Sequence, residues 1–372
     1  MPAFRVNTEN DCLDLLEHFR WGDSMKPICP WTGSPDCRQI PDDSRGRKQY
    51  YSKTKRRVFN VGTNTIFHNA QKDLTILFDG VDQFVNGRKG ISSDEMSDRV
   101  QVQQSTSHHL QSKLRAVFAH PDLLAKLGCV VQADETYYGQ LLGNMHDDVK
   151  EELRKMAQIT GDRTLLNKTP VFGMVDELGK VFSTAVRDTT ANTLIPIIKK
   201  MVKKGSIFIS DEFPVYKKLP AEGYHHLTVN HSKGQYNVTR GGTLDIYSPD
   251  LLRDLTLQDP RFGRFKDNQE IRQHFHNNRI EKYWAEQKGI YHGTYHHVEN
   301  LELFCKEMDF RRNYKELKPD QRMGLVLKHC EWTEAHVPLL QQKNNKPNIV
   351  RQYLDEFQNN HQENKASRSL SH

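Results

Sequence analysis

The chain has 372 residues, of which 36% are hydrophobic and 27% charged, a composition typical of a soluble globular protein with two or three domains. No apolar run approaches the roughly 20 residues of a membrane span, and the N-terminus lacks a signal peptide's apolar core, so no membrane partner is expected. The net charge is +6 and the six cysteines are scattered. A reduced, intracellular setting is therefore expected.

Residues 1–70 are predicted to form a small basic module. Helical apolar spacing between residues 10 and 19 is followed by a short-period, β-like stretch that contains two tyrosines. The cations of this stretch that we expect to bind DNA are Arg47, Lys48, Lys53, Lys55, Arg56 and Arg57. A basic hairpin with aromatic residues can lie along a phosphate backbone. A solvated charged hairpin is the alternative interpretation.

Residues 71–120 are predicted to be helical. Apolar residues from 74 to 85 keep the helical spacing, glycines at 87 and 90 break it, and Ser92 begins a further helix. A short helix followed by a second one fits a helix-turn-helix, whose later helix would present His108, Lys113 and Arg115 to DNA. A plain three-helix bundle is an equally good interpretation of this segment.

From residue 126 the apolar spacing changes to that of strands. The predicted strands are at 128–133, 170–175, 181–186, 206–210 and 226–230, and helices are predicted at 193–203 and from about 278. The turn at 176–179 makes the second and third strands a hairpin. A mixed sheet with helices on its faces accounts for this order, which is also the element order of an RNase H-like fold. Polar inserts are expected at about 140–168 and 237–276.

Three acids occupy suggestive positions in this order. Asp134 closes the first predicted strand, Asp211 closes the fourth, and Glu281 lies on the late helix. A single strand-end aspartate is more often a turn or capping residue. However, the first and fourth strands would be neighbours, so the three carboxylates would converge. Clustered carboxylates need a cation, and such hard oxygen ligands select Mg²⁺ or Mn²⁺. Two such ions would suit an in-line phosphoryl displacement.

The late helix also carries a cation. Lys288 follows Glu281 by seven residues, so the two side chains share one helical face. An adjoining, mostly apolar stripe (Ile280, Tyr283, Trp284 and Gln287) can anchor the helix on a core. Beside a metal site, Lys288 would hold a phosphate near the scissile bond. A surface ion pair is the alternative.

Four segments together resemble a DDE transposase. They are Asp134-Glu135-Thr136-Tyr137, Ser210-Asp211-Glu212, residues 230–236 (NHSKGQY) and residues 278–284 (NRIEKYW), the last followed by Lys288-Gly289-Ile290-Tyr291. More narrowly, the chain resembles the bacterial insertion-sequence transposases related to Merlin elements, which carry an ISXO2-like transposase domain. The most specific part is the stretch from Lys288 through Val298, and the resemblance spans about residues 9–315.

The resemblance implies a polynucleotidyl transferase and endonuclease that uses Mg²⁺ or Mn²⁺. It implies Asp134, Asp211 and Glu281 as the catalytic metal ligands, and Lys288 as a contact to the DNA end. His231 and Lys233 match the family's His-Ser segment and would support the site or touch DNA. The implied partners are the element's terminal inverted repeats, target DNA and further copies of the chain, as a dimer on paired ends. The implied location is the bacterial nucleoid, or the nucleus in a eukaryotic host.

Two departures from the family pattern stand out. Members commonly carry a four-cysteine zinc ribbon, whereas here only Cys29 and Cys37 remain, so the N-terminal hairpin is a degenerate ribbon and bound zinc is not expected. The segment 237–276 is longer than the family pattern requires. It is either a DNA-binding insertion or a solvated loop.

The expected organisation is therefore a ribbon-like module (1–70), a helix-turn-helix (71–120), an RNase H-like catalytic domain (125–315), and a C-terminal helical region with a disordered tail (316–372). Two other functions remain open. One is a transposase-derived protein that binds specific DNA without cutting it. The other is a nuclease of the RNase H type that cuts nucleic acid without joining it.

Overall fold

The computed structural model describes residues 4, 6–139, 151, 168–211, 214–228, 253, 256–257, 260–264, 266, 278–296, 298 and 300–331. Most of the two predicted inserts, His231, Lys233 and everything after residue 331 lie outside the described residues. None of the helices in the described part is long and apolar enough to cross a membrane.

The N-terminal part combines a small sheet with helices. Strands β1, β2 and β3 form a three-stranded antiparallel sheet in that order, so the predicted basic hairpin, β2–β3, has a third strand beside it. The elements here are α1 (Glu9–Trp21), β1 (Cys37–Ile40), β2 (Gln49–Ser52), β3 (Arg57–Phe59), α2 (Leu74–Asn86), α3 (Ser93–Val100) and α4 (Gln104–Phe118). Helices α3 and α4 are joined by residues 101–103, the short connection expected for a helix-turn-helix. That α4 reads DNA stays a prediction.

One hydrophobic core runs through all of these elements. Leu13 of α1, Tyr50 of β2, Phe78 of α2 and Leu114 of α4 are buried together with Val326 of α12 (Pro319–Lys328). The boundary predicted at residue 70 therefore does not separate two cores, and the segment after residue 315 returns to pack on the N-terminal part. Sequence patterns did not indicate this, because each helix's apolar face looks the same whichever partner covers it.

The second part is a five-stranded mixed sheet with strand order β6-β5-β4-β7-β8. Strand β4 pairs parallel with β7, and β7 pairs parallel with β8. Strand β5 pairs antiparallel with both of its neighbours, β4 and β6. Its elements are β4 (Val130–Tyr138), β5 (Thr169–Asp176), β6 (Val181–Ala185), α6 (Ala191–Met201), β7 (Ile207–Ser210), a 3-10 segment (Pro214–Glu222), β8 (His225–Thr228), α10 (Asn278–Ile290), a π-helical turn (Tyr291–Tyr295) and α11 (Leu301–Asn313). The predicted mixed α/β class is confirmed.

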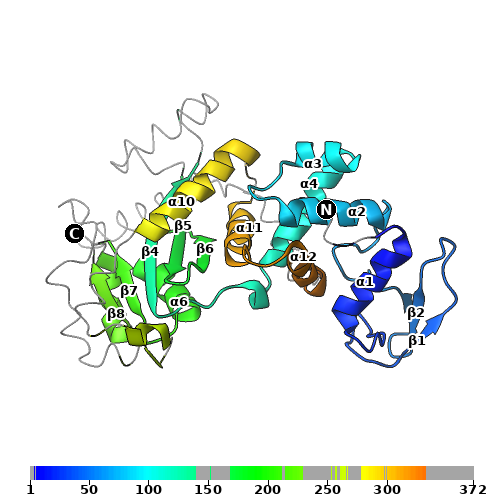
Figure 1. Cartoon of the computed structure of the whole chain (residues 1–372), viewed down its shortest axis with the longest axis horizontal. Coiled ribbons are helices and arrows are strands. Elements are labelled where there is room, and N and C mark those ends of the chain that lie inside the picture. Colours follow the sequence, from blue (N-terminus) through cyan, green and yellow to red (C-terminus); the bar gives the residue numbers. More distant parts are fainter. Residues whose placement is uncertain are drawn as a thin grey trace, which may run out of the picture.

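Helices cover both faces of this sheet. Alternate residues of β4 point to opposite faces. Val131 and Ala133 pack with α6 and the 3-10 segment, whereas Tyr138 packs on the side of α10 and α11. Figure 1 shows α10 crossing the sheet over β4 and β5, and α11 with α12 lying between the sheet and helices α2–α4. Helix α11 therefore stands between the two parts of the molecule.

Helix α11 satisfies the free edge of strand β6 with its side chains. Asn313 accepts from the Val181 N–H (2.7 Å) and donates to the Val181 C=O (2.9 Å), and Asp309 accepts from the Ser183 N–H (2.8 Å). Lys306 donates to the Ser183 C=O (2.6 Å). An unpaired edge is otherwise a site for another strand to add. The edge of β6 is thus closed by the helix that follows the predicted catalytic helix.

Candidate active site at the β4–β7 junction

The sheet register places two of the predicted acids next to each other. Parallel pairing of β4 and β7 runs from Val130↔Ile207 to Gln132↔Ile209. Continued by two residues, this register sets Asp211 beside Asp134, on strands that lie roughly 4.8 Å apart. Asp211 directly follows β7. The two residues therefore lie on neighbouring strands at the level where β7 ends. That they share a metal ion stays a prediction.

One detail of the prediction is wrong. Asp134 does not close its strand, because β4 continues to Tyr138. The reason is the longer neighbour on the other side: β5 pairs with β4 as far as Tyr138↔Thr169. On one side, Asp134 is paired within the β4–β5 ladder. On the other side, it lies beyond the last residue of β7, where Asp211 follows that strand.

Three side chains of β4 fix helix α10 across the sheet. The side-chain oxygen of Gln132 accepts from the backbone N–H groups of Arg279 (3.0 Å) and Ile280 (3.3 Å), which satisfies donors at the start of the helix. The indole N–H of Trp284 donates to Asp134 (3.1 Å). The Tyr138 hydroxyl donates to the Gln287 side chain near the helix end. We call these three contacts the α10 clamp.

Gly173 makes room for the middle contact of the clamp. It is the cross-strand partner of Asp134 on β5. A Cβ at this position would lie 2.3 Å from the Trp284 ring, far inside contact distance. The absence of a side chain at Gly173 therefore leaves room for the indole beside β5, from where it reaches Asp134.

The clamp determines where Glu281 and Lys288 lie. Ile280, Tyr283, Trp284 and Gln287, the predicted anchoring stripe, are all buried, whereas Glu281 and Lys288 are exposed. The continuous helix keeps those two side chains on one face, as the seven-residue spacing predicted.

Burial and neighbouring charges both act on the carboxyl group of Asp134. Burial raises the pKa of Asp134 to about 6, and the negative charges of Asp211 and Glu281 act in the same direction. The indole N–H of Trp284 opposes the rise by stabilising the carboxylate. A position where the charges of several carboxylates act on one another suits a cation.

Glu135, the residue after Asp134 on β4, carries a second carboxylate. Glu135 points to the opposite face of the sheet, where it accepts from the hydroxyl of buried Tyr216. Burial raises the pKa of Glu135 to about 7, and the charges of Asp134 and Asp211 contribute in the same direction. Glu135 therefore adds to the negative potential at the junction without facing α10.

The three acids are not drawn into one tight cluster. Among the described residues, the set of potential metal ligands whose donor atoms all lie within 4.8 Å of one another is a different one, formed by His120, Asp122 and His329.

The predicted DNA-binding cations of the N-terminal module fall into two groups. Arg47 is paired with Asp43 (2.8 Å), Lys48 with Asp14, and Lys53 with Asp36 (2.9 Å). The remaining cations, Lys55, Arg56 and Arg57, are exposed in the β2–β3 turn and at the start of β3. The exposed group is the part of the hairpin best placed to meet a phosphate backbone.

Helix α4 requires a correction. Arg115 is only 9% exposed and forms an ion pair with fully buried Glu307 of α11 (2.7 Å). The same carboxylate also pairs with Arg311 (2.7 Å). Arg115 therefore joins α4 to α11 and is not presented to DNA. Lys113 is half-buried and donates to the Ile66 C=O (3.1 Å), and burial lowers its pKa. His108 is half-buried near the start of α4.

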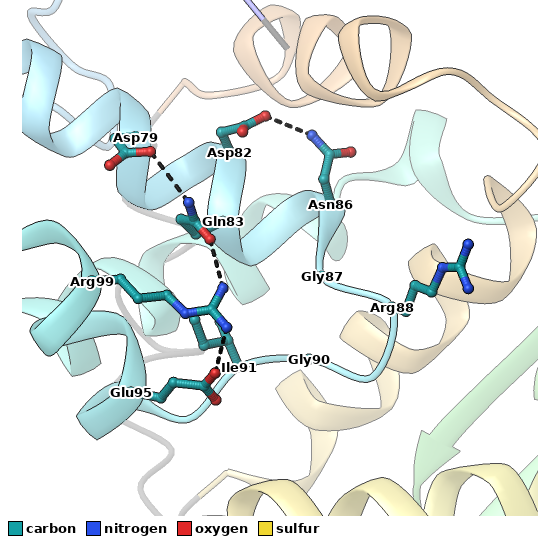
Figure 2. Close-up of a pocket in the computed structure, with 10 residues that line it drawn as sticks. All are labelled: Asp79, Asp82, Gln83, Asn86, Gly87, Arg88, Gly90, Ile91, Glu95 and Arg99. Atoms are coloured by element: carbon teal, nitrogen blue, oxygen red, sulfur yellow. Dashed lines mark hydrogen bonds and ion pairs between the residues drawn. The ribbon is translucent and has the colours of Figure 1, made fainter. Parts of the chain in front are cut away.

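A separate cavity of about 560 Å³ lies between α2, α3 and the connecting loop. Figure 2 shows that Arg99 in this cavity bridges Glu95 (2.6 Å) and Gln83 (2.9 Å). Its walls carry both signs of charge, and none of the predicted site residues lines it. It therefore does not extend the carboxylate site.

The sequence analysis missed the residues that hold the site together. Gln132 is 3% exposed, and as the polar residue within the apolar run of the strand predicted at 128–133 it was a usable signal for a helix-capping contact. Gly173 and the Glu135–Tyr216 pair gave no comparable signal, because their roles depend on which strands are neighbours.

Comparison with known proteins agrees with the predicted resemblance. Residues 126–245 match the family model described as the ISXO2-like transposase domain. The match contains Asp134 and Asp211 and ends before Glu281 and Lys288. No curated protein matches the chain.

The solved structures that match the chain include two of Mos1. The Mos1 strand transfer complex is 11% identical over 66% of this chain and 77% of that chain, with a TM-score of 0.18. A pre-cleavage Mos1 transpososome is 13% identical over 68% and 79% of the two chains, also with a TM-score of 0.18. Such low scores do not establish a shared fold. The family match is the comparison that bears on the resemblance: residues 126–245 are similar to the ISXO2-like transposase domain, as the motifs predicted.

Proposed function

We propose that the chain is a transposase that cleaves DNA at the ends of an insertion sequence and joins those ends to target DNA. The observation that carries the proposal is the β4–β7 register, which brings Asp211 beside Asp134 under the helix that bears Glu281. The strand order β6-β5-β4-β7-β8, with β5 alone antiparallel to the central strand β4, supports an RNase H-like domain as the scaffold.

Asp134, Asp211 and Glu281 are the proposed ligands of Mg²⁺ or Mn²⁺. The donor set fits, because it consists of hard carboxylate oxygens. The pKa of Asp134, which burial raises and to which the charges of Asp211 and Glu281 add, supports the proposal that these acids share one site. When bound, the ions supply an activated water or 3′-hydroxyl and stabilise the departing oxygen.

Other residues of the chain orient the proposed metal ligands and bind the DNA. Trp284 orients Asp134 by donating to one of its oxygens, and the α10 clamp holds Glu281 over the junction. Lys288, exposed on the same face of α10, would bind a phosphate of the DNA end. Lys55, Arg56, Arg57 and the outer face of α4 would bind the terminal inverted repeats, and pairing of two ends calls for at least two copies of the chain.

The test uses the full chain and DNA that carries the element's own inverted repeats, in Mg²⁺. Asp134→Asn, Asp211→Asn and Glu281→Gln should each abolish both cleavage and strand transfer. Glu286→Gln is the matched control, because Glu286 lies on the same helix but pairs with Arg312 (2.8 Å).

Strand transfer that survives in any of the three variants would disprove the assignment of that ligand. A wild-type chain that binds the repeats but never nicks them in Mg²⁺ or Mn²⁺ would instead support the non-catalytic DNA-binding alternative. Cleavage of DNA without any repeat would support the nuclease alternative.

A further inference from the structure

Three potential metal ligands gather at a place that the carboxylate site does not use. His120 and Asp122 lie where the chain leaves α4, and His329 directly follows α12. One donor atom of each lies within 4.8 Å of the other two. The two segments are far apart in sequence, so the fold alone brings the three side chains together.

The side chains are held on well-packed backbone. Around Asp122, a single 3-10 turn (Pro121–Leu123) is fixed by buried Leu123, whose C=O accepts from the Tyr314 hydroxyl (3.2 Å). On the other side, the buried residue after His329 is Cys330, whose C=O accepts from the Ile66 N–H (3.0 Å). Little backbone motion is therefore needed to keep the ligands in place.

The two imidazole rings lie against each other. Their ring centroids are 4.5 Å apart with an interplanar angle of 37°. The His120 Nδ1 lies 3.9 Å from a carboxylate oxygen of Asp122. The side chain of His120 is 31% exposed and that of Asp122 is 71% exposed, so an ion can enter from solvent.

We propose that His120, Asp122 and His329 bind a transition-metal ion of the zinc class. Two imidazole nitrogens and one carboxylate oxygen are a ligand set that Zn²⁺ accepts, with water as the fourth ligand. The set is unlike the all-oxygen site at the β4–β7 junction, so Mg²⁺ would not compete for it effectively. The site is also separate from Cys29 and Cys37, and it is independent of the function proposed above.

The ion would join the segment leading into β4 to the end of α12, and so would fasten the N-terminal core to the start of the catalytic sheet.

Zinc binding to the full chain can be measured by calorimetric titration in excess Mg²⁺, which occupies the carboxylate site. Wild type should bind Zn²⁺ saturably, and His120→Ala, His329→Ala and Asp122→Asn should each weaken binding by at least ~10-fold, the lower end of what even outer-shell changes cost a zinc site. The melting temperature of wild type should rise with added Zn²⁺, and that of His329→Ala should not.

His68→Ala is the matched control. The Nδ1 of His68 accepts the Asn64 N–H at 3.3 Å, as the Nδ1 of His120 accepts the Asp122 N–H at 3.3 Å, but His68 belongs to no such ligand set among the described residues. Its variant should bind Zn²⁺ like wild type, and so should Cys37→Ser.

Substituting Co²⁺ for Zn²⁺ gives a second readout. The absorption spectrum of the bound Co²⁺ should lack thiolate charge-transfer bands, because the proposed ligands are nitrogen and oxygen atoms. Absence of saturable Zn²⁺ binding in wild type, undiminished binding in His329→Ala, or loss of binding in Cys37→Ser would each overturn the proposal. Circular dichroism of the metal-free variants separates loss of ligands from loss of the fold.

Discussion

Replacing Trp284 by Phe tests whether the α10 clamp prepares Asp134 for a metal. The substitution removes the indole N–H that donates to Asp134 (3.1 Å) and keeps an aromatic ring against Gly173. Asp134 then loses the donor that orients it and that opposes the rise of its pKa. The carboxylate becomes both less well oriented and more easily protonated, and both changes weaken metal binding.

The size of the effect follows from the hydrogen bond. A bond to a charged group contributes about 1.5–3 kcal/mol, and every 1.4 kcal/mol corresponds to about tenfold in affinity. The donor–acceptor distance of 3.1 Å is long for a charge-assisted bond, so the lower end applies. The Mg²⁺ concentration needed for half-maximal cleavage should therefore rise about tenfold in Trp284→Phe.

The assay is cleavage of inverted-repeat DNA over a series of Mg²⁺ concentrations. Tyr283→Phe is the control, because it removes a hydrogen bond of the neighbouring residue to Asp309 (2.6 Å) without touching Asp134. It should lower the melting temperature and leave the Mg²⁺ dependence unchanged. Equal Mg²⁺ dependence in wild type and Trp284→Phe would refute the reasoning.

Three further outcomes are expected. Gly173→Ala places a methyl group 2.3 Å from the Trp284 ring, so the indole must move away from Asp134, and the Mg²⁺ dependence should shift as in Trp284→Phe. Asn313→Ala leaves a buried N–H and C=O of the β6 edge without their partner, and denaturant unfolding should show a loss of about 1–3 kcal/mol, with no loss as the contradicting result. Burial lowers the pKa of His226 to about 4 from 6.5, so the folded chain binds fewer protons than the unfolded chain between those values. The stability from neutral His226 is full above pH 6.5 and falls as the pH decreases towards 4, and His226→Asn should remove up to about 3 kcal/mol of this loss when unfolding at pH 7 and pH 4.5 is compared with wild type.

The sequence predicted best those helices and strands that show a regular spacing of apolar residues within their own residues. Strands β5 and β6, predicted at 170–175 and 181–186, occur at Thr169–Asp176 and Val181–Ala185. Helix α10 begins at Asn278, with the predicted stripe buried. The mixed sheet followed from the order of these elements. The neighbouring positions of Asp134 and Asp211 could be expected because the first and fourth predicted strands pair in parallel, although β4 continues past Asp134.

What the sequence did not reveal depends on partners distant along the chain. Helix α11 carries Lys306, Glu307, Asp309 and Asn313, which look solvent-facing by type, yet all are at most 7% exposed. Each is buried because its side chain binds the edge of β6 or a buried cation. Arg115 was misassigned to DNA for the same reason: its partner Glu307 lies 192 residues further along the chain. No local period distinguishes a cation that binds a phosphate from one that binds a distant carboxylate.

The buried charges of α11 bear on how such a protein positions DNA. Glu307 accepts from Arg115 of α4 (2.7 Å) and from Arg311 (2.8 Å), while Arg311 also donates to the C=O groups of Phe84 (2.7 Å) and Gly87 at the end of α2. On its other side, α11 is bonded to the edge of β6 through Asn313. Breaking one partner of a buried ion pair costs about 3–5 kcal/mol, so the proposed DNA-binding helices and the sheet that carries the acids cannot separate at low energetic cost. A DNA end held by the α3–α4 segment would therefore be aligned with the β4–β7 junction by a rigid helix, and not by a flexible linker.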